Sequence, residues 1–349
     1  MQHSSGRPVA ALPSVEALAP GLWSVPLPLP IPELRYVYVY IFTTAEGTYL
    51  VDAGWDTDES YDALERGLAA AGTSVQDVQG IMVTHSHPDH YGMAGRIREE
   101  SGCWVGLHPA EAELAGKRAS GPHLSSIDVS ADLMMAGAPT SLSLRHTSVE
   151  LPSSPHIPTD PPDRLIADGD RIEVPGWDVR AVWTPGHTPG HLCFALPDLD
   201  ALLTGDHLLP RITPNIGTRD AGKDPLGDFL SSLDRVESMS PSVAYPAHEY
   251  RFAGVSARAR TVAGHHAARL DEVEAVVTAG PATEWQIAQG MTWSRAWEEM
   301  DGLRLLSALE EARAHIIALA ARGVIEPVLG RPRQWRRAMR STSPRAAGA

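Results

Sequence analysis

The chain contains little cysteine, no long apolar run and no excess of basic residues. Its two cysteines, Cys103 and Cys193, hardly form a disulfide framework in 349 residues, so a reducing compartment is expected. No stretch reaches the about 18 apolar residues that span a bilayer, and residues 1–20 lack the pattern of a secretory leader. The formal net charge of −14 argues against a general nucleic-acid-binding surface. These absences predict a cytoplasmic protein that does not enter membranes.

What the chain does contain is typical of a globular protein. Apolar residues make up 43% of it and charged residues 21%. The length predicts one large domain and a smaller one. Residues 1–20, rich in Ala, Pro and Ser, are expected to be a loose lead-in. After them, strand-like runs are followed by a β-α-β-α order, which predicts a layered α/β fold.

The strongest signal in the sequence is THSHPDH at 84–90, directly after the apolar run GIMV. Imidazole and carboxylate groups bind divalent zinc at about 2 Å. His85 and His87, separated by one residue in an extended loop, put both rings on the same side. Asp89 and His90, one turn further on, can reach a neighbouring position. One short segment can therefore contribute to two metal positions.

Three more candidate ligands stand just past later apolar runs. His187 follows VWTPG, Asp206 follows ALLTG, and His248 follows VAYPA. A single His or Asp after a strand is usually an ordinary loop residue. Because these three follow the 84–90 cluster in this order, we interpret them as candidates for the same site.

The segments HSHPDH, PGHTPGH, LLTGD and PAH together resemble the successive motifs of the metallo-β-lactamase superfamily, over roughly residues 20–255. The resemblance implies a four-layer αββα sandwich, of mixed α/β class, with the metals at one edge between the sheets. It also implies a ligand set. The first metal would be bound by His85, His87 and His187, the second by Asp89, His90 and His248, and Asp206 would bridge both.

The resemblance also implies the cofactors and their supports. Two divalent ions are expected, with zinc as the first choice and iron or manganese as alternatives. Asp52, in YLVDAG, matches an aspartate of the family that orients a metal ligand. Thr84 and Thr188 are candidates for the same supporting role.

The chemistry that the resemblance implies is hydrolysis. Two metals would share a hydroxide that forms near neutral pH, because metal binding lowers the pKa of water. The hydroxide would attack a carbonyl carbon or a phosphorus, and Asp89 would steer the proton of the attacking water. No Ser–His–Asp arrangement is evident.

Some positions depart from the family pattern. Lactonases of this fold carry a tyrosine soon after the bridging aspartate, whereas His207, Leu208 and Leu209 follow here, so a lactonase is disfavoured. Ala247 and Glu249 stand on either side of His248, where the family usually has glycine. These two changes make the position of His248 a question for the structure.

The domain boundaries follow from changes in composition. We predict a catalytic domain at 21–258, with a Ser- and Pro-rich insertion at 117–165 near the active site. Residues 259–330 have helical texture and resemble the winged-helix-like appendage of a subgroup that includes glyoxalase-II-like hydrolases and a single-strand-specific endoribonuclease. Residues 331–349 form a basic tail in an otherwise acidic chain.

Two functional classes remain open. The first is a hydrolase of a small-molecule ester or thioester, similar to hydroxyacylglutathione hydrolases. The second is a single-strand-specific endoribonuclease or phosphodiesterase, which the negative net charge disfavours. We expect a small-molecule substrate and no membrane partner, and leave a homodimer open. An apolar inner face of the insertion, indicated by Leu133, Met134 and Met135, would favour an acyl or aromatic substrate.

Overall fold

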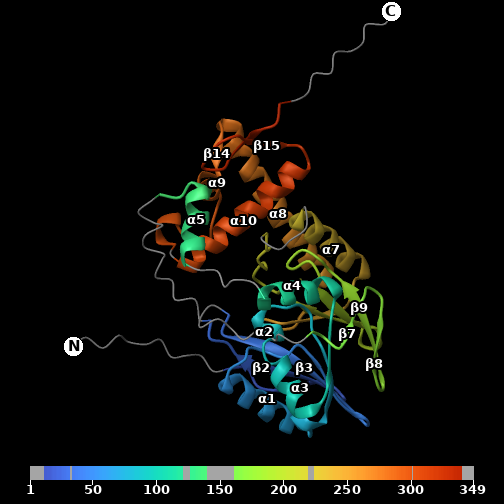
Figure 1. The fold of residues 1–349 in the computed structure, drawn as a ribbon. Helices are drawn as coiled ribbons and strands as arrows, with labels where there is room; N and C mark the ends of the chain where they lie inside the picture. Colours follow the sequence, from blue (N-terminus) through green and yellow to red (C-terminus); the bar gives the residue numbers. More distant parts are fainter. Residues whose placement is uncertain are drawn as a thin grey trace, which may run out of the picture. The chain divides into compact units, whose positions relative to one another are not determined.

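The structure is a computed structural model that describes residues 12–31, 34–120, 126–139, 161–218, 224–300 and 302–339. The chain divides into two compact units, which we call unit 1 and unit 2. Unit 1 comprises Met1–His123, Leu151–Pro214 and Ser232–Ala259, and unit 2 comprises Leu124–Glu150, Asn215–Ser231 and Arg260–Ala349. The colour gradient of Figure 1 follows the chain through both units.

Unit 1 opens with a seven-stranded sheet whose strands lie side by side in chain order. The strands are β1 (Glu16–Ala19), β2 (Leu22–Pro28), β3 (Tyr36–Thr44), β4 (Gly47–Val51), β5 (Val78–Met82), β6 (Trp104–Leu107) and β7 (Arg164–Leu165). Pairing is antiparallel from β1 to β4 and parallel from β4 to β7. The tyrosines and valines of β3 favour an extended backbone.

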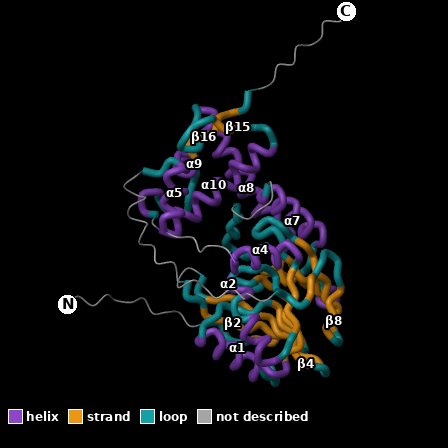
Figure 2. The backbone as a smooth tube through the Cα atoms, viewed as in Figure 1, coloured by secondary structure: helices purple, strands orange, loops and turns teal. Residues whose placement is uncertain are grey.

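A six-stranded sheet forms the other half of unit 1, in the order β13-β12-β11-β10-β9-β8. Its strands are β8 (Arg171–Val174), β9 (Trp177–Trp183), β10 (Leu192–Leu196), β11 (Ala201–Gly205), β12 (Val243–Pro246) and β13 (Phe252–Ala253). All neighbours pair antiparallel except β11 and β12, which are parallel. The strands of both sheets are drawn in orange in Figure 2.

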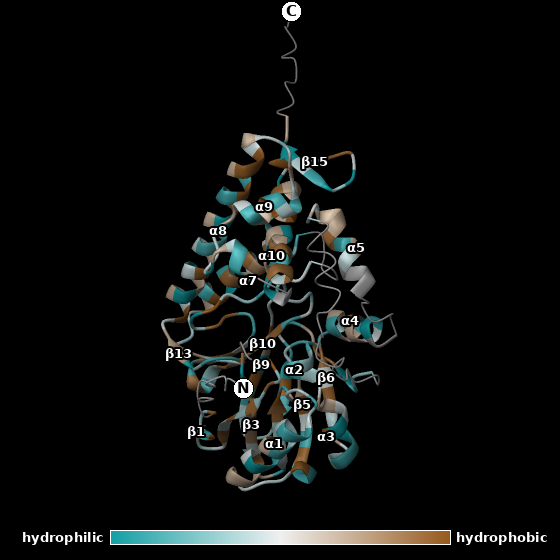
Figure 3. Ribbon diagram, turned by 90° about the vertical axis from the view of Figure 1, so that its left-hand side faces the viewer, coloured by the Kyte–Doolittle hydropathy of each residue, from teal (hydrophilic) through white to brown (hydrophobic). Residues whose placement is uncertain are grey.

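The two sheets share one buried apolar core. Phe42 and Met82 of the seven-stranded sheet belong to the same cluster as Phe194 and Leu203 of the six-stranded sheet. Strands of both sheets carry strongly hydrophobic positions in Figure 3. The alternation of buried and exposed residues along β8 shows that only one face of that strand is covered. The mixed α/β fold predicted from the sequence is confirmed.

Helices α1 (Asp58–Ala70) and α3 (Ala94–Ser101) cover the other face of the seven-stranded sheet. Leu64 and Leu68 of α1 lie in the same apolar cluster as Val25 and Leu50 of the strands. Thr57 caps α1 by accepting a hydrogen bond from the Ser60 amide at 3.2 Å. The cap fixes the start of α1, and the buried leucines fix the face that it turns to the sheet.

Unit 2 combines helices with a small sheet. It contains α5 (Ser126–Ala136), the start of α7 (Pro225–Met239), most of α8 (Val255–Ala279), α9 (Glu284–Gly290) and α10 (Gly302–Ala321), with β14 (Ala282–Thr283), β15 (Ile325–Val328) and β16 (Gln334–Arg337). The three strands pair antiparallel in the order β14-β16-β15. Within the described ranges, no helix is long and apolar enough to cross a membrane. The helical texture predicted from residue 259 onward is confirmed.

Three segments differ from the sequence-based expectation. The supposed lead-in at 1–20 ends early, because Glu16–Ala19 pairs with β2 as strand β1. The insertion at 117–165 contains helix α5. Apolar residues stand on its buried side, such as Leu133, and also on its exposed side, such as Met134, which is 57% exposed. The sequence therefore shows no clear helical period there. The basic tail at 331–349 begins with β16, where Arg336 pairs with Glu326. The insertion's residues 121–125 and 140–160 lie outside the described part, so its predicted place near the active site stays a prediction.

A buried histidine pair joins α8 and α10 in unit 2. His266 Nδ1 lies 3.1 Å from His315 Nε2, and His315 Nδ1 donates to the Glu311 carbonyl oxygen at 2.6 Å. Burial lowers the pKa of His315, so this ring is neutral and its Nε2 accepts a hydrogen bond from His266 Nδ1. Both rings are therefore neutral, and His266 Nε2 is buried without a hydrogen-bond partner among the described residues. Burial, together with the neighbouring His315, lowers the pKa of His266 to about 3.

Acid is expected to destabilise unit 2 through this pair. Because the pKa of His266 is near 6.5 in the unfolded chain and about 3 in the folded one, protons favour the unfolded state and stability falls as pH drops from 6.5 towards 3. Among the neighbouring groups, Glu311 raises the pKa of His266, whereas His315, His265 and Arg269 lower it further. The free energy of unfolding should be about 2–3 kcal/mol lower at pH 4.5 than at pH 7 because of this residue.

The measurement is denaturant unfolding between pH 7 and 4.5, with a chelator present so that metal release does not contribute. His266→Gln should flatten the pH dependence, whereas the same substitution at the 40% exposed His265, which makes only a minor contribution to the low pKa of His266, should change it much less. Equal slopes for His266→Gln and the unaltered protein would contradict the assignment.

Candidate metal centre

The predicted ligands of unit 1 lie at the C-terminal ends of strands. His85 and His87 follow β5, and α2 (Pro88–Tyr91) carries Asp89 and His90. The remaining ligands come from the other sheet, with His187 after β9, Asp206 after β11 and His248 after β12. Pro88 at the first position of α2 allows the loop to turn directly into a helix. The structure thus brings together all seven residues that the sequence singled out.

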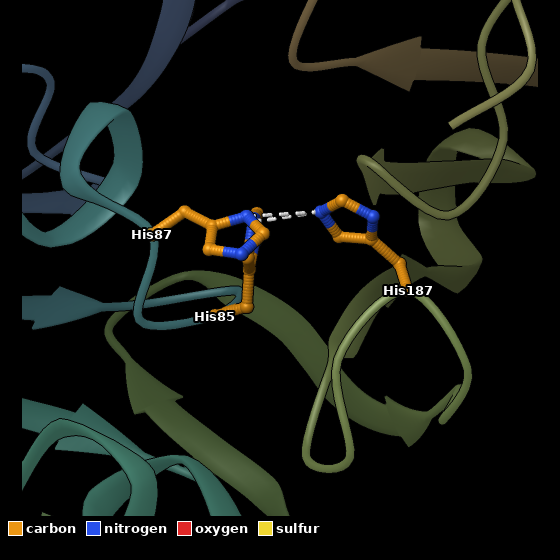
Figure 4. A group of neighbouring side chains, drawn as sticks. All are labelled: His85, His87 and His187. Carbon is orange, nitrogen blue, oxygen red and sulfur yellow. Dashed lines mark hydrogen bonds between the residues drawn. The ribbon is translucent and has the colours of Figure 1, made fainter. Parts of the chain in front are cut away.

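Three histidines form the first group. His85 Nε2 lies 2.8 Å from His87 Nδ1, and His187 Nε2 lies 3.2 and 3.1 Å from these two atoms. Figure 4 shows His187 reaching across from its own loop towards the other two rings. His85 and His187 are buried, and His87 is half-buried.

Asp89, His90 and His248 form the second group, and Asp206 faces both groups. His248 Nε2 lies 3.4 Å from Asp89 Oδ2, and His90 Nε2 lies 3.6 Å from the same oxygen. Asp206 Oδ1 lies 3.2 Å from His248 Nε2, whereas Asp206 Oδ2 lies 3.6 Å from His187 Nε2. The two oxygens of one carboxylate therefore point to different groups.

The donor atoms fit divalent metal ions. Two ligand atoms on one ion at 2.0–2.2 Å are at most about 4.4 Å apart. The distances of 2.8–3.6 Å given above for pairs within each group meet that limit. In the first group, three ring nitrogens lie within 3.2 Å of one another, an arrangement that suits a shared cation. In the second group, His90 Nε2, His248 Nε2 and Asp206 Oδ1 are buried without hydrogen-bond partners among the described residues. Imidazole and carboxylate are the groups that zinc prefers.

The electrostatics of the second group favour positive charge. Burial lowers the pKa of His248, but Asp206 and Asp89 outweigh it and raise the pKa to about 10. Burial raises the pKa of Asp206, but His248 and His90 outweigh it and hold that pKa well below its usual range. Carboxylates that hold protons on these rings would also hold a divalent cation, and binding it would release the protons.

The electrostatics of the first group favour uncharged rings. Burial, reinforced by the neighbouring rings of His90, His87 and His187, holds the pKa of His85 well below its usual value. Burial, with His187 next, does the same for the pKa of His87. Neutral imidazoles with free lone pairs are the form in which histidine binds metals. His85 and His87 are therefore already in the form that binds a metal at neutral pH.

Asp52 and Thr84 form hydrogen bonds with one another and with two of the predicted ligands. Asp52 Oδ2 accepts from His90 Nδ1 at 2.8 Å and from Thr84 Oγ1 at 3.0 Å, and Oδ1 accepts from the Thr84 amide at 2.7 Å. Thr84 Oγ1 also lies 3.1 Å from His85 Nδ1. Asp52 has a φ of 66°, a left-handed conformation that Asp tolerates better than most residues. Thr188, the third predicted support, differs, because its buried hydroxyl has no hydrogen-bond partner in the described structure.

The two departures beside His248 are accommodated. Ala247 is buried in the apolar cluster, and its amide donates to the Gly205 carbonyl at 3.0 Å. Glu249 has a φ of 72°, which explains why glycine would suit this position. Its side chain accepts from the Arg211 amide at 2.9 Å and thereby holds the segment after β11. His248 Nδ1 lies 2.9 Å from the Tyr36 carbonyl, which fixes its ring.

Two supporting residues were not identified from the sequence. His191 Nε2 accepts from the Asp206 amide at 3.2 Å, and its Nδ1 lies 2.9 Å from Thr184 Oγ1. The second histidine of PGHTPGH was a visible signal for it. Glu111, in α4 (Pro109–Ser120), is fully buried and contacts two of the ligand-bearing loops. Nothing in its local sequence marks it.

Comparison with known proteins identifies the family. The family described as "Metallo-beta-lactamase superfamily" matches residues 32–248. A crystal structure of a metallo-beta-lactamase family protein from Thermus thermophilus is similar with a TM-score of 0.77 and 34% identity, covering 92% of this chain and 100% of that one.

Curated relatives are similar over longer or shorter parts of the chain. A probable metallo-hydrolase from Bacillus subtilis is 24% identical over 79% of this chain and 85% of its own length. An atrochrysone carboxyl ACP thioesterase from Aspergillus fumigatus is 37% identical over 26% of each chain. This chain spans about a third or less of the fungal relatives that it matches.

Proposed function

Because the chain belongs to the metallo-β-lactamase superfamily, we propose that it is a binuclear metal-dependent hydrolase of a small-molecule ester or thioester. The observation that carries this proposal is the position of Asp206, whose Oδ1 faces His248 and whose Oδ2 faces His187. A carboxylate arranged in this way supports a site for two ions. Zinc is our first choice, with iron or manganese as alternatives.

The side chains around the site have separate roles in the proposed reaction. Two divalent ions would polarise a substrate oxygen and lower the pKa of water, so that hydroxide is available near neutral pH. Asp89 is buried beside His248 and is positioned to take a proton from the attacking water. Asp52 keeps His90 oriented, and Thr84 does the same for His85.

The proposed substrate class rests on charge and on the relatives. The fungal thioesterase is named for the hydrolysis of a thioester on an acyl carrier protein, and it is 37% identical over the matched 89 residues. The net charge of −14 disfavours a long polyanion, so an endoribonuclease is the weaker alternative.

We also propose that unit 2 is winged-helix-like, because α8, α9 and α10 are accompanied by the sheet β14-β16-β15.

Acyl thioesters are the substrates with which to test the proposal. The purified protein should release thiol from some members of a panel that includes acyl-coenzyme A, acyl-glutathione and acyl-pantetheine thioesters. A chelator should abolish the release, and added Zn²⁺ should restore it. Thiol release is followed with a colorimetric thiol reagent.

The metal content is measured on the same preparation. Two ions per chain with chelator-sensitive turnover are the expected result. Two ions per chain without turnover on any thioester or ester would reject the substrate class and favour a phosphodiester, to be tested with single-stranded RNA. Fewer than two ions per chain after incubation with excess zinc would reject the binuclear site itself.

A further inference from the structure

Glu111 is a fully buried carboxylate at the start of α4, outside the predicted ligand set. Its Oε2 accepts from the Ser86 amide at 2.8 Å and from the Ser86 hydroxyl at 2.7 Å. Its Oε1 accepts from the Gly190 amide at 2.8 Å. Three donors therefore converge on one buried side chain, and a buried carboxyl group requires such partners.

The residues that Glu111 contacts lie next to the first metal group. Ser86 stands between His85 and His87, and Gly190 lies three residues after His187. One carboxylate thus connects the loop after β5 with the loop after β9. Those two loops come from different sheets, and they supply all three histidines of the group.

The approach of α4 to the second loop is close and depends on glycine. A Cβ atom on Gly190 would lie 2.8 Å from the Glu111 amide nitrogen, 2.9 Å from Glu111 Cγ and 2.8 Å from His108 Nδ1. Backbone atoms cannot move out of the way as the end of a flexible side chain can. The contact therefore depends on both residues. Gly190 leaves room for the start of α4, and the side chain of Glu111 is long enough to reach the Gly190 amide.

We propose that Glu111 is a positioning residue that sets the separation of His187 from His85 and His87, and thereby the geometry and affinity of the first metal position. The inference rests on the proposed function, because it assigns Glu111 a role towards the metal of that site. A glutamine at 111 keeps the length and shape, but its amide NH₂ must face one of the three donors. The loop contacting that NH₂ would move, and one ring nitrogen would move with it.

The test compares Glu111→Gln with a matched substitution on the same helix. Glu113→Gln removes a carboxylate that is 70% exposed and pairs only with Lys117 in the described structure. Metal affinities are measured by competition with a chromogenic chelator, and the ligand geometry by the absorption spectrum of the cobalt(II)-substituted protein. Glu111→Gln should weaken the binding of one ion about 10–100-fold and change the cobalt spectrum, with the other ion affected less. Glu113→Gln should match the unaltered protein in both measurements.

Ser86→Ala is the second variant, for the case that Glu111→Gln does not fold. It removes one of the three donors and keeps the backbone, so a smaller loss of affinity for the same ion is expected. Unchanged metal affinities and an unchanged cobalt spectrum in folded Glu111→Gln, or in Ser86→Ala if the first variant is unfolded, would overturn the inference. Binding of fewer than two ions by the unaltered protein would instead reject the proposed function.

Discussion

Asp206→Ala should remove metal binding and hydrolysis together. The carboxylate faces His248 and His90 with Oδ1 and His187 with Oδ2, so its loss affects both groups at once. Even residues that only orient metal ligands cost 10–100-fold in affinity or activity when replaced. For a residue that would contact both proposed ions, we expect a loss of turnover of at least about 100-fold. Metal content by mass spectrometry and thiol release by absorbance are the two readouts.

The control for this experiment is Asp198→Ala. Asp198 is exposed and lies in the turn just before β11, at the opposite end of the strand that leads to Asp206. It should retain the full metal content and the full rate. A folded Asp206→Ala protein that still hydrolyses thioesters at the normal rate would rule out the two-metal reaction.

Asp52→Asn should weaken metal binding while the fold is kept. Asparagine tolerates the left-handed backbone of this position, where φ is 66°, so the turn after β4 remains unstrained. Its amide group, however, cannot accept from His90 Nδ1 and from both donors of Thr84. We expect about a 10–100-fold loss of affinity for the ion that His90 would bind. Zinc competition titration measures this directly.

Asp58→Asn is the matched control, because Asp58 is 92% exposed and forms a surface ion pair with Arg96. It should bind both ions as tightly as the unaltered protein. If Asp52→Asn does the same, Asp52 has no part in orienting His90.

The grouping of the candidate ligands could largely be predicted from the sequence, because each of them lies in a short segment directly after an apolar strand. His85 to His90 occupy a single loop and the helix turn after it, and His187, Asp206 and His248 each end a run that reads as a strand. Strands that are buried on both faces give continuous apolar runs, and the residue after such a run lies at the sheet edge. The family motifs then supplied the grouping.

Glu111 could not be predicted, because its role depends on contacts 25 and 79 residues away along the chain. A glutamate near the start of a helix is usually explained by the helix dipole. Helix α5 was missed for a different reason, since its exposed Met134 interrupts the apolar period. Strand β16 was hidden by its arginines, which are neutralised by Glu326 and Glu274 only in the folded chain.

Because the candidate ligands come from both sheets, a bound ion would also lengthen the lifetime of the folded protein in the cell. His85 and His87 come from one sheet and His187 from the other, so an ion bound by all three would connect elements that are about 100 residues apart in the chain. A ligand that binds only the native state adds about 2.7 kcal/mol at a hundred times its dissociation constant. Metal-starved cells would therefore hold chains whose unit 1 opens more often and is degraded sooner. Scarcity of metal would lower the abundance of the protein, in addition to the activity of each molecule.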